Sequence, residues 1–294
     1  PVAALKERGA FMQKDKKYVM AIDQGTTGTR VILFSRDGTP AASSYEEVEQ
    51  IYPHPGWVEH DPNQYFEGTV RGMKDVLRKA KSGWEDVAAI GITCQRETTT
   101  LWDRETGEPL ANSIVWMCRR TADLCEELKE QGYEEMVREK TGLFIDAYFS
   151  GTKIKWILDN VPGVREKAEQ GRVCMGTVDT WLMWKLSGGR YHVTDYSNAS
   201  RTMFLNIHTL SWDEELMGVL GIPKSILPEL RPSSGIMAYT DESICGAEVP
   251  FAGDAGDQHA ATFGQTCFEP GMAKNTYGTA LALMMNIGQE PKLS

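Results

Sequence analysis

The sequence predicts an α/β fold in which a mixed sheet is flanked by helices. Residues 18–22 and 31–34 are apolar runs joined by a turn rich in Gly and Thr, a pattern typical of a β-hairpin. A helix is expected after Asp61 and Pro62, because an N-cap residue followed by proline favours a helix start. Residues 87–92 then form an apolar run typical of a strand buried on both faces. The order strand, helix, buried strand indicates parallel strands linked through helices.

Length and charge limit the possible functions. The chain has 294 residues, 41% of them hydrophobic, which is enough for one large domain and part of a second. With 41 acidic and 31 basic residues the net charge is −10. We therefore expect no nucleic-acid partner, since a nucleic-acid surface needs a basic patch. A nucleotide is not excluded, because local donors and a metal hold a triphosphate.

The six cysteines are scattered and include no Cys-x-x-Cys pair, which is typical of neither a zinc site nor a disulfide framework. We interpret them as reduced thiols of a cytoplasmic protein. No apolar run approaches the roughly 20 residues that span a bilayer, so we expect no membrane span. Residues 1–16 lack a continuous apolar segment and are predicted to be a flexible arm, not a secretory signal.

The turn of the first hairpin is a candidate phosphate site. It reads DQGTTGTR over residues 23–30, and it leads into a strand instead of the helix that follows a Walker-type loop. Backbone N–H groups at a glycine-rich tip can contact phosphate oxygens closely. Asp23, at the end of the first strand, is a candidate ligand for Mg²⁺ through water. The alternative is an ordinary tight hairpin with a polar tip. A third strand is expected within residues 41–51.

Arg96 and Glu97 come directly after the buried strand 87–92. In open α/β sheets, ligands bind beyond the carboxyl ends of the strands. A carboxylate accepts hydrogen bonds from hydroxyls and a guanidinium donates to their oxygens, so the pair is a candidate polyol site. The alternative is a surface ion pair, which is the commoner arrangement and contributes little.

Further elements follow along the chain. Residues 103–108 are expected to form a β-turn between two strands, at residues 98–102 and 113–117. Helices are predicted at residues 119–131, residues 150–160 and residues 180–186. The tryptophans of the last two helices are interpreted as core residues; they are Trp156, Trp181 and Trp184.

The last part of the chain repeats the opening pattern. We expect residues 17–250 to form the first domain and residues 251–294 to begin a second, incomplete one. Residues 271–287 again read as a strand, a tip containing Gly278 and Thr279, and a strand. Two similar hairpins indicate duplicated halves that close on one nucleotide. A short helix is also expected over residues 260–263, with Asp257 as its N-cap.

These segments resemble the glycerol kinases, a branch of the FGGY family of carbohydrate kinases within the actin/hexokinase/Hsp70-like superfamily. The similarity extends from about Lys17 to the last residue, and residues 95–98 match the glycerol kinases in particular. The matching segments are residues 21–27, 91–98, 114–121, 148–160, 176–181, 193–202, 255–258 and 274–279. The resemblance implies a ribonuclease-H-like first domain of the actin-like ATPase type and the beginning of a second similar domain. Members of the family are considerably longer, so we expect the isolated chain to be inactive and the adenine pocket to lie beyond Ser294.

The resemblance also implies a reaction and its residues. The reaction is the ATP-dependent phosphorylation of glycerol to glycerol 3-phosphate, with Mg²⁺ as cofactor and a homo-oligomer as the complete form. Asp257 is implied as the base that accepts the hydroxyl proton. The implied glycerol-binding residues are Arg96, Glu97, Trp116, Tyr148, Asp257 and Gln258, and the implied nucleotide-binding residues are Thr26, Thr27, Gly28, Arg30 and Thr279.

Three positions depart from the family's pattern. Gly28 stands where a serine is common, Ala280 where a glycine is common, and Ala282 where an aromatic residue is common. These departures leave the strictness of the glycerol preference open. The alternatives are a kinase for another small polyol or ketose and a non-catalytic nucleotide-binding relative of the same superfamily.

Overall fold

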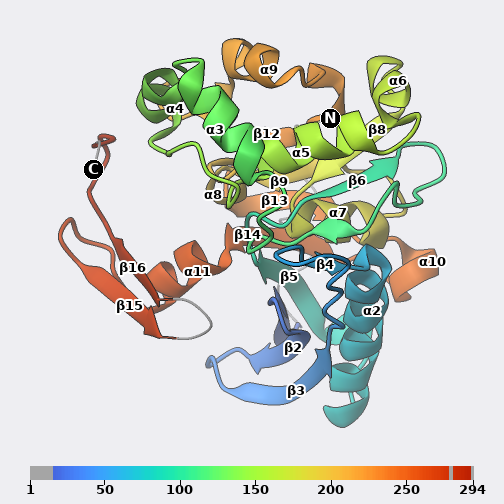
Figure 1. Cartoon of the computed structure of the whole chain (residues 1–294). Coiled ribbons are helices and arrows are strands. Elements are labelled where there is room, and N and C mark those ends of the chain that lie inside the picture. Colours follow the sequence, from blue (N-terminus) through green and yellow to red (C-terminus); the bar gives the residue numbers. More distant parts are fainter. Residues whose placement is uncertain (1–15, 278–280, 293–294) are drawn as a thin grey trace.

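A mixed six-stranded sheet lies at the centre of the fold, with the strand order β13-β14-β5-β1-β2-β3 (Figure 1). The computed structural model describes residues 16–277 and 281–292. β5 runs parallel to both β1 and β14, whereas the other pairs are antiparallel, so the predicted mixed sheet is confirmed. Its strands are β1 Tyr18–Gln24, β2 Gly28–Ser35, β3 Pro40–Glu47, β5 Val87–Cys94, β13 Ser234–Tyr239 and β14 Pro250–Gly256.

Helices cover this sheet and form a second layer beside it. They are α2 Pro62–Lys79, α3 Ala122–Glu130, α4 Glu134–Thr141, α5 Ser150–Asn160, α6 Val164–Glu169, α7 Val178–Leu186, α8 Tyr196–Ala199, α9 Glu214–Leu220, α10 Glu242–Cys245 and α11 Asp257–Gly264. Short strand pairs complete the fold: β4 Glu59–His60 with β7 Ser113–Ile114, β6 Thr100–Asp103 with β8 Val173–Gly176, β9 Val193–Asp195 with β12 Glu229–Arg231, β10 Leu205–Asn206 with β11 Ser211–Trp212, and β15 Ala273–Tyr277 with β16 Leu281–Met285.

Helix α2 packs closely on the first hairpin. The Asp61 carboxylate caps the helix by accepting a hydrogen bond of 2.9 Å from the Asn63 N–H, as the sequence predicts. A Cβ atom at Gly72 would lie 2.7 Å from Cγ2 of Val31, so the helix approaches β2 more closely than any side chain at this position allows. This close packing fixes the hairpin whose tip faces the candidate site.

Two separate clusters of buried apolar residues form the cores of the described chain. The first contains the buried rings of Trp102, Trp181 and Trp184 between the sheet, α2 and α7, as expected for the last two residues. The second fills the layer of α3 to α6 and α9, and Trp156 packs partly buried against it. Helices α3 and α5 meet here through the side chains of Thr121 and Thr152, whose hydroxyls lie 2.9 Å apart.

Some elements differ from the prediction. The helix expected at residues 119–131 begins at Ala122. Thr121 is its N-cap, but the Thr121 hydroxyl contacts Thr152 of α5 instead of a backbone N–H of the helix. The strand expected at residues 113–117 is limited to Ser113–Ile114. Beyond it the chain leaves the ladder, and the side chain of Trp116 reaches the hairpin tip instead.

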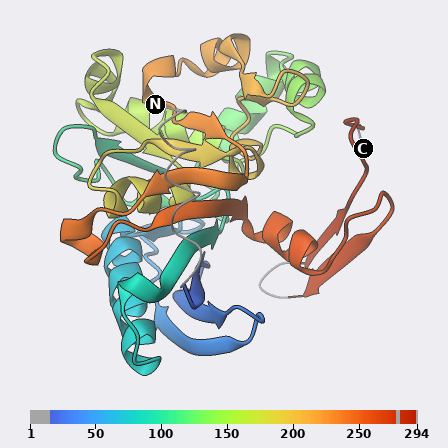
Figure 2. The same ribbon diagram turned by 180° about the vertical axis from the view of Figure 1, so that it is seen from behind.

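The expected domain boundary at residue 250 falls at the first residue of β14. Residues 251–256 pair with β5 and so lie in the first sheet instead of opening a second unit. We propose that the second unit starts after β14. Helix α11 and the β15–β16 hairpin lie to one side of the main body in both views (Figures 1 and 2).

All six cysteines are free and buried. Among the described residues, no helix is long and apolar enough to cross a membrane. Residues 1–15 of the arm expected over residues 1–16, and the phosphate contact expected at Thr279, fall outside the described residues.

Candidate functional site

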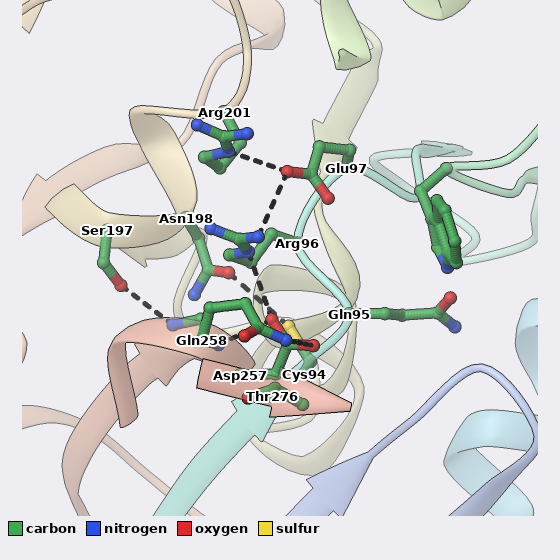
Figure 3. Close-up of polar contacts among 12 residues, drawn as sticks. Cys94, Gln95, Arg96, Glu97, Ser197, Asn198, Arg201, Asp257, Gln258 and Thr276 are labelled. Carbon is green, nitrogen blue, oxygen red and sulfur yellow. Dashed lines mark hydrogen bonds and ion pairs between the residues drawn. The ribbon is translucent and has the colours of Figure 1, made fainter. Parts of the chain in front are cut away.

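A cavity of ≈ 390 Å³ lies between the segment after β5, the tip of the first hairpin, the segment before α5, the start of α11 and the strands β15 and β16. All six residues expected to bind glycerol line it, together with Thr26 of the hairpin tip. The lining residues are Thr26, Gln95, Arg96, Glu97, Trp116, Tyr148, Asp257, Gln258, Thr276, Leu281 and Ala282. Segments far apart in the sequence therefore form one site (Figure 3).

Arg96 and Glu97 are buried, being 6% and 1% exposed, so the alternative of a surface ion pair is wrong. Oε1 of Glu97 lies 2.7 Å from Nε of Arg201 and 3.7 Å from a terminal nitrogen of Arg96. A buried carboxylate needs such partners, because removing an unpaired charge from water is costly. Both charges are thus fixed at the cavity wall.

Asp257 pairs with the other side of Arg96. Its Oδ1 lies 3.1 Å from Nε of Arg96, and its side chain is 40% exposed toward the open cleft. Asp257 is the first residue of α11 and Gly256 is the N-cap, so the expected role of Asp257 as N-cap is wrong. A Cβ atom at Gly256 would lie 2.3 Å from Cδ of Arg96, so this contact requires glycine.

A chain of polar contacts extends from Asp257 to the second hairpin. The Gln258 amide donates a hydrogen bond of 3.3 Å to Oδ2 of Asp257. The Lys274 ammonium in turn donates to the side-chain Oε1 of Gln258, and to the Thr276 hydroxyl at 2.7 Å. Burial lowers the pKa of Lys274, although the nearby Asp257 carboxylate acts in the opposite direction. Lys274 therefore connects β15 to the carboxylate.

Two aromatic rings form the apolar wall of the cavity. The rings of Trp116 and Tyr148 pack edge to face with centroids 5.6 Å apart. The indole N–H of Trp116 donates a hydrogen bond of 2.8 Å to the Thr26 hydroxyl, which ties the wall to the hairpin tip. Burial raises the pKa of Tyr148, and the charge of Glu97 raises it further. The phenol thus stays neutral and can donate a hydrogen bond.

Three more residues expected to contact phosphates, Thr27, Gly28 and Arg30, lie at or next to the tip of the first hairpin. Thr27 and Arg30 are exposed there. Gly28 is buried, and a Cβ atom would lie 2.6 Å from the Tyr45 ring and from the Glu46 carbonyl oxygen. A side chain at position 28 would therefore not fit, and a ligand could contact only backbone atoms there.

Asp23 is the next-to-last residue of β1, close to this tip, and it is exposed. The protein around its carboxylate displaces water and raises its pKa, and the neighbouring Asp257 carboxylate raises the pKa further. Two nearby carboxylates form a hard-oxygen site whose repulsion a divalent cation would relieve. The residues present therefore fit the expected Mg²⁺ ion.

Two cations next to the site, one buried and one half-buried, were not predicted from the sequence. Lys153 is fully buried and donates to the carbonyl oxygens of Glu97 and Phe149, each at 3.2 Å, and to that of Tyr148. Arg201 follows α8 and contacts Glu97. Both residues lie within segments that match the resemblance. The local sequence gives no signal for Lys153, because polar residues and a second lysine surround it.

A cluster of three buried carboxylates lies behind the site. The ligand-type oxygens of Asp179, Asp195 and Asp254 lie within 4.8 Å of one another. Protein donors already occupy most of them: Asp179 accepts from three threonine hydroxyls, and Asp195 caps α8. Burial raises the pKa of Asp254 well above its usual value, as does the charge of Asp179. We interpret the cluster as structural, with Asp254 protonated.

Comparisons with known proteins identify the family. The description "FGGY family of carbohydrate kinases, N-terminal domain" matches residues 18–264. The chain is 61% identical over 274 residues to "Glycerol kinase 2" of Thermotoga maritima, covering 93% of this chain and 55% of that protein. It is 60% identical over 274 residues to "Glycerol kinase" of Caldanaerobacter subterraneus, with the same coverage.

Solved structures show the same fold. The glycerol kinase of Plasmodium falciparum with ADP superposes with a TM-score of 0.87 at 34% identity, over 92% of this chain and 54% of that one. A gluconate kinase of Lactobacillus acidophilus superposes with a TM-score of 0.82 at 24% identity, over 91% of this chain and 53% of that one, which shows the fold alone. The chain spans about half the length of the curated relatives it matches.

Proposed function

The chain belongs to the FGGY family of carbohydrate kinases, and we propose that the protein it forms transfers the γ-phosphoryl group of ATP to glycerol. One observation carries this proposal: two buried charges, Arg96 and Glu97, and the carboxylate of Asp257 face one small cavity with an aromatic wall. Such a cavity offers acceptors and donors for neighbouring hydroxyls and an apolar surface for the carbons between them. The sequence identity of 60–61% to proteins named glycerol kinase supports the choice of glycerol as the substrate among the small polyols.

The substrate residues divide the work between binding and proton transfer. Glu97 accepts hydrogen bonds from hydroxyls and Arg96 donates to their oxygens, while Trp116 and Tyr148 cover the carbon skeleton. Asp257 accepts the proton of the reacting hydroxyl as its oxygen forms a bond to the γ-phosphorus. The bond between that phosphorus and the β,γ-bridging oxygen breaks, and ADP leaves with the bridging oxygen. Phosphoryl transfer depends mainly on such positioning and on charge stabilisation.

The first hairpin is the proposed phosphate site. Thr26, Thr27 and Arg30 offer side-chain donors and Gly28 offers its backbone, and Thr279 is proposed to contact the phosphates from the second hairpin. Asp23 is proposed to hold Mg²⁺ through water. The ion supplies positive charge that offsets the phosphate oxygens. Residence in the cytoplasm is also proposed, since the six free thiols suit a reducing compartment. The homo-oligomeric state stays a prediction.

A coupled ADP-release assay over a panel of polyols and ketoses tests the proposed function. It is run on this chain and on a longer natural form that contains it, with glycerol, xylulose and gluconate as acceptors. We expect glycerol to give the highest kcat/KM in the active form. Asp257→Asn should lower kcat by about 10²–10⁴-fold while the glycerol KM changes little. Preference for another acceptor would contradict the choice of glycerol, and near wild-type kcat in the variant would remove Asp257 from the mechanism.

A further inference from the structure

We propose that Arg201 is a positioning residue, which holds one oxygen of Glu97 so that the other stays free for substrate and Arg96 stays paired with Asp257. The inference rests on the proposed function of the cavity. Arg201 does not line the ≈ 390 Å³ cavity itself. It contacts Glu97, although the two residues lie 104 positions apart in the sequence.

Arg201 lies against three of the residues that build the site. Its Nε donates a hydrogen bond of 2.7 Å to Oε1 of Glu97. Its guanidinium lies over the rings of Phe149, at 4.9 Å from the centroid, and Tyr148, at 5.9 Å. The backbone adds a further link, because the Ser150 N–H donates to the Arg201 carbonyl oxygen at 3.3 Å. The start of α5 and the guanidinium are thus held together, so the direction of the guanidinium toward Glu97 is fixed.

The contacts of Glu97 are one-sided. The two cationic nitrogens near its carboxylate both face Oε1: Nε of Arg201 at 2.7 Å and a terminal nitrogen of Arg96 at 3.7 Å. In Figure 3 the second oxygen points away from Arg201. An oxygen in this position can accept a hydrogen bond from a substrate hydroxyl without competing with the ion pair.

Arg96 lies near two carboxylates, and it is closer to one of them than to the other. It lies 3.1 Å from Asp257 but 3.7 Å from Glu97. Glu97 is 1% exposed, so without Arg201 its charge would be left with Arg96 at 3.7 Å and with the buried Lys153, whose ammonium is already bound to the backbone carbonyl oxygen of Glu97. Loss of a partner leaves a buried charge uncompensated, which draws remaining cations toward it. Removal of Arg201 is therefore expected to pull Arg96 away from Asp257.

A double-mutant cycle on glycerol binding tests this inference. The dissociation constant is measured by calorimetry for the chain itself, for Arg201→Met, for Glu97→Gln and for the double variant. We expect Arg201→Met to weaken binding by about tenfold or more, as loss of a buried charge partner does. In the Glu97→Gln background the same change should alter the dissociation constant by less than about twofold, because the charge that Arg201 serves is gone.

Two further variants control for folding. Arg165→Met removes a similarly exposed arginine that pairs with Asp159 away from the cavity, and it should leave glycerol binding unchanged. Arg201→Lys keeps the charge but loses the flat guanidinium, so its affinity should lie between those of the wild type and Arg201→Met. It also replaces Arg201→Met in the cycle if that variant unfolds, as judged by thermal denaturation.

The outcomes separate the two proposals. If the wild-type chain binds no glycerol, the proposed function of the cavity fails. If the wild type binds and Arg201→Met binds equally well, the positioning role is overturned. An equal loss in both Glu97 backgrounds also overturns it, since Arg201 would then act independently of that carboxylate.

Discussion

We expect the substitution Gly256→Ala, which adds a single methyl group, to displace Arg96 in the site. Its backbone, with φ −55° and ψ 147°, is open to any residue, so alanine introduces no backbone strain. The Cβ atom would lie 2.3 Å from Cδ and 2.4 Å from Cγ of Arg96. The effect of Gly256→Ala is therefore purely steric.

The size of the effect follows from the distance. Carbon atoms in ordinary contact lie about 3.5–4.0 Å apart, so the Arg96 side chain or β14 must shift by about 1 Å. Overpacking of this kind costs about 1–3 kcal/mol of stability. A displacement of about 1 Å in a catalytic site can lower the reaction rate by about 10²-fold. Arg96 would move relative to Asp257, so binding should suffer together with stability.

Urea denaturation and calorimetric titration with glycerol measure both effects. Gly253→Ala is the matched control, because a Cβ atom on this residue of the same strand would meet its nearest atoms at an ordinary 4.0 Å. We expect Gly256→Ala to lower the free energy of unfolding by about 1–3 kcal/mol and to weaken glycerol binding by about 10–100-fold. If both variants change the two quantities equally, the steric reasoning is refuted.

Three other variants probe separate parts of the site. Glu97→Gln keeps the size of the side chain but removes its charge, so glycerol affinity should fall by about tenfold while nucleotide affinity is unchanged; equal losses for both would indicate a structural role. Asp254→Asn should remove a pH dependence of stability. Burial and Asp179 raise the pKa of Asp254 well above 3.8, so above that pH the unfolded chain holds fewer protons and stability falls as pH rises. Urea denaturation at pH 5 and pH 8 should show this slope in the wild type and a smaller slope in the variant; identical slopes would mean that Asp254 is ionised. Trp116→Phe removes the hydrogen bond to Thr26 and should cost about 1 kcal/mol in urea denaturation. An unchanged free energy would show that the bond contributes nothing.

Elements with strong local patterns were predictable from the sequence. The first hairpin, α2 after its Asp61 cap and the buried strand β5 all depend on neighbouring residues, and each lies close to its expected position. The pair Arg96 and Glu97 was recognisable because it directly follows a buried strand.

Long-range contacts were not predictable in the same way. The partner of Glu97 lies 104 residues away, and the acceptors of Lys153 are backbone carbonyls that no side-chain pattern reveals. The expectation of a boundary at residue 250 has a similar origin. Strand β14 contains two glycines and reads as a loop, yet it joins the sheet because β5 offers it backbone partners on both sides of an irregularity between Phe251 and Gly253.

A crystal structure of the chain with glycerol tests the central claim most directly. The crystals should be grown and cooled without other polyols, at a glycerol concentration about ten times its dissociation constant, so that the site is about 90% occupied. The account predicts one glycerol molecule in the cavity, with hydroxyls within hydrogen-bond distance of Glu97 and Arg96 and a terminal hydroxyl beside Asp257. An empty cavity at that concentration, or glycerol bound at another place with these side chains unchanged, would contradict it.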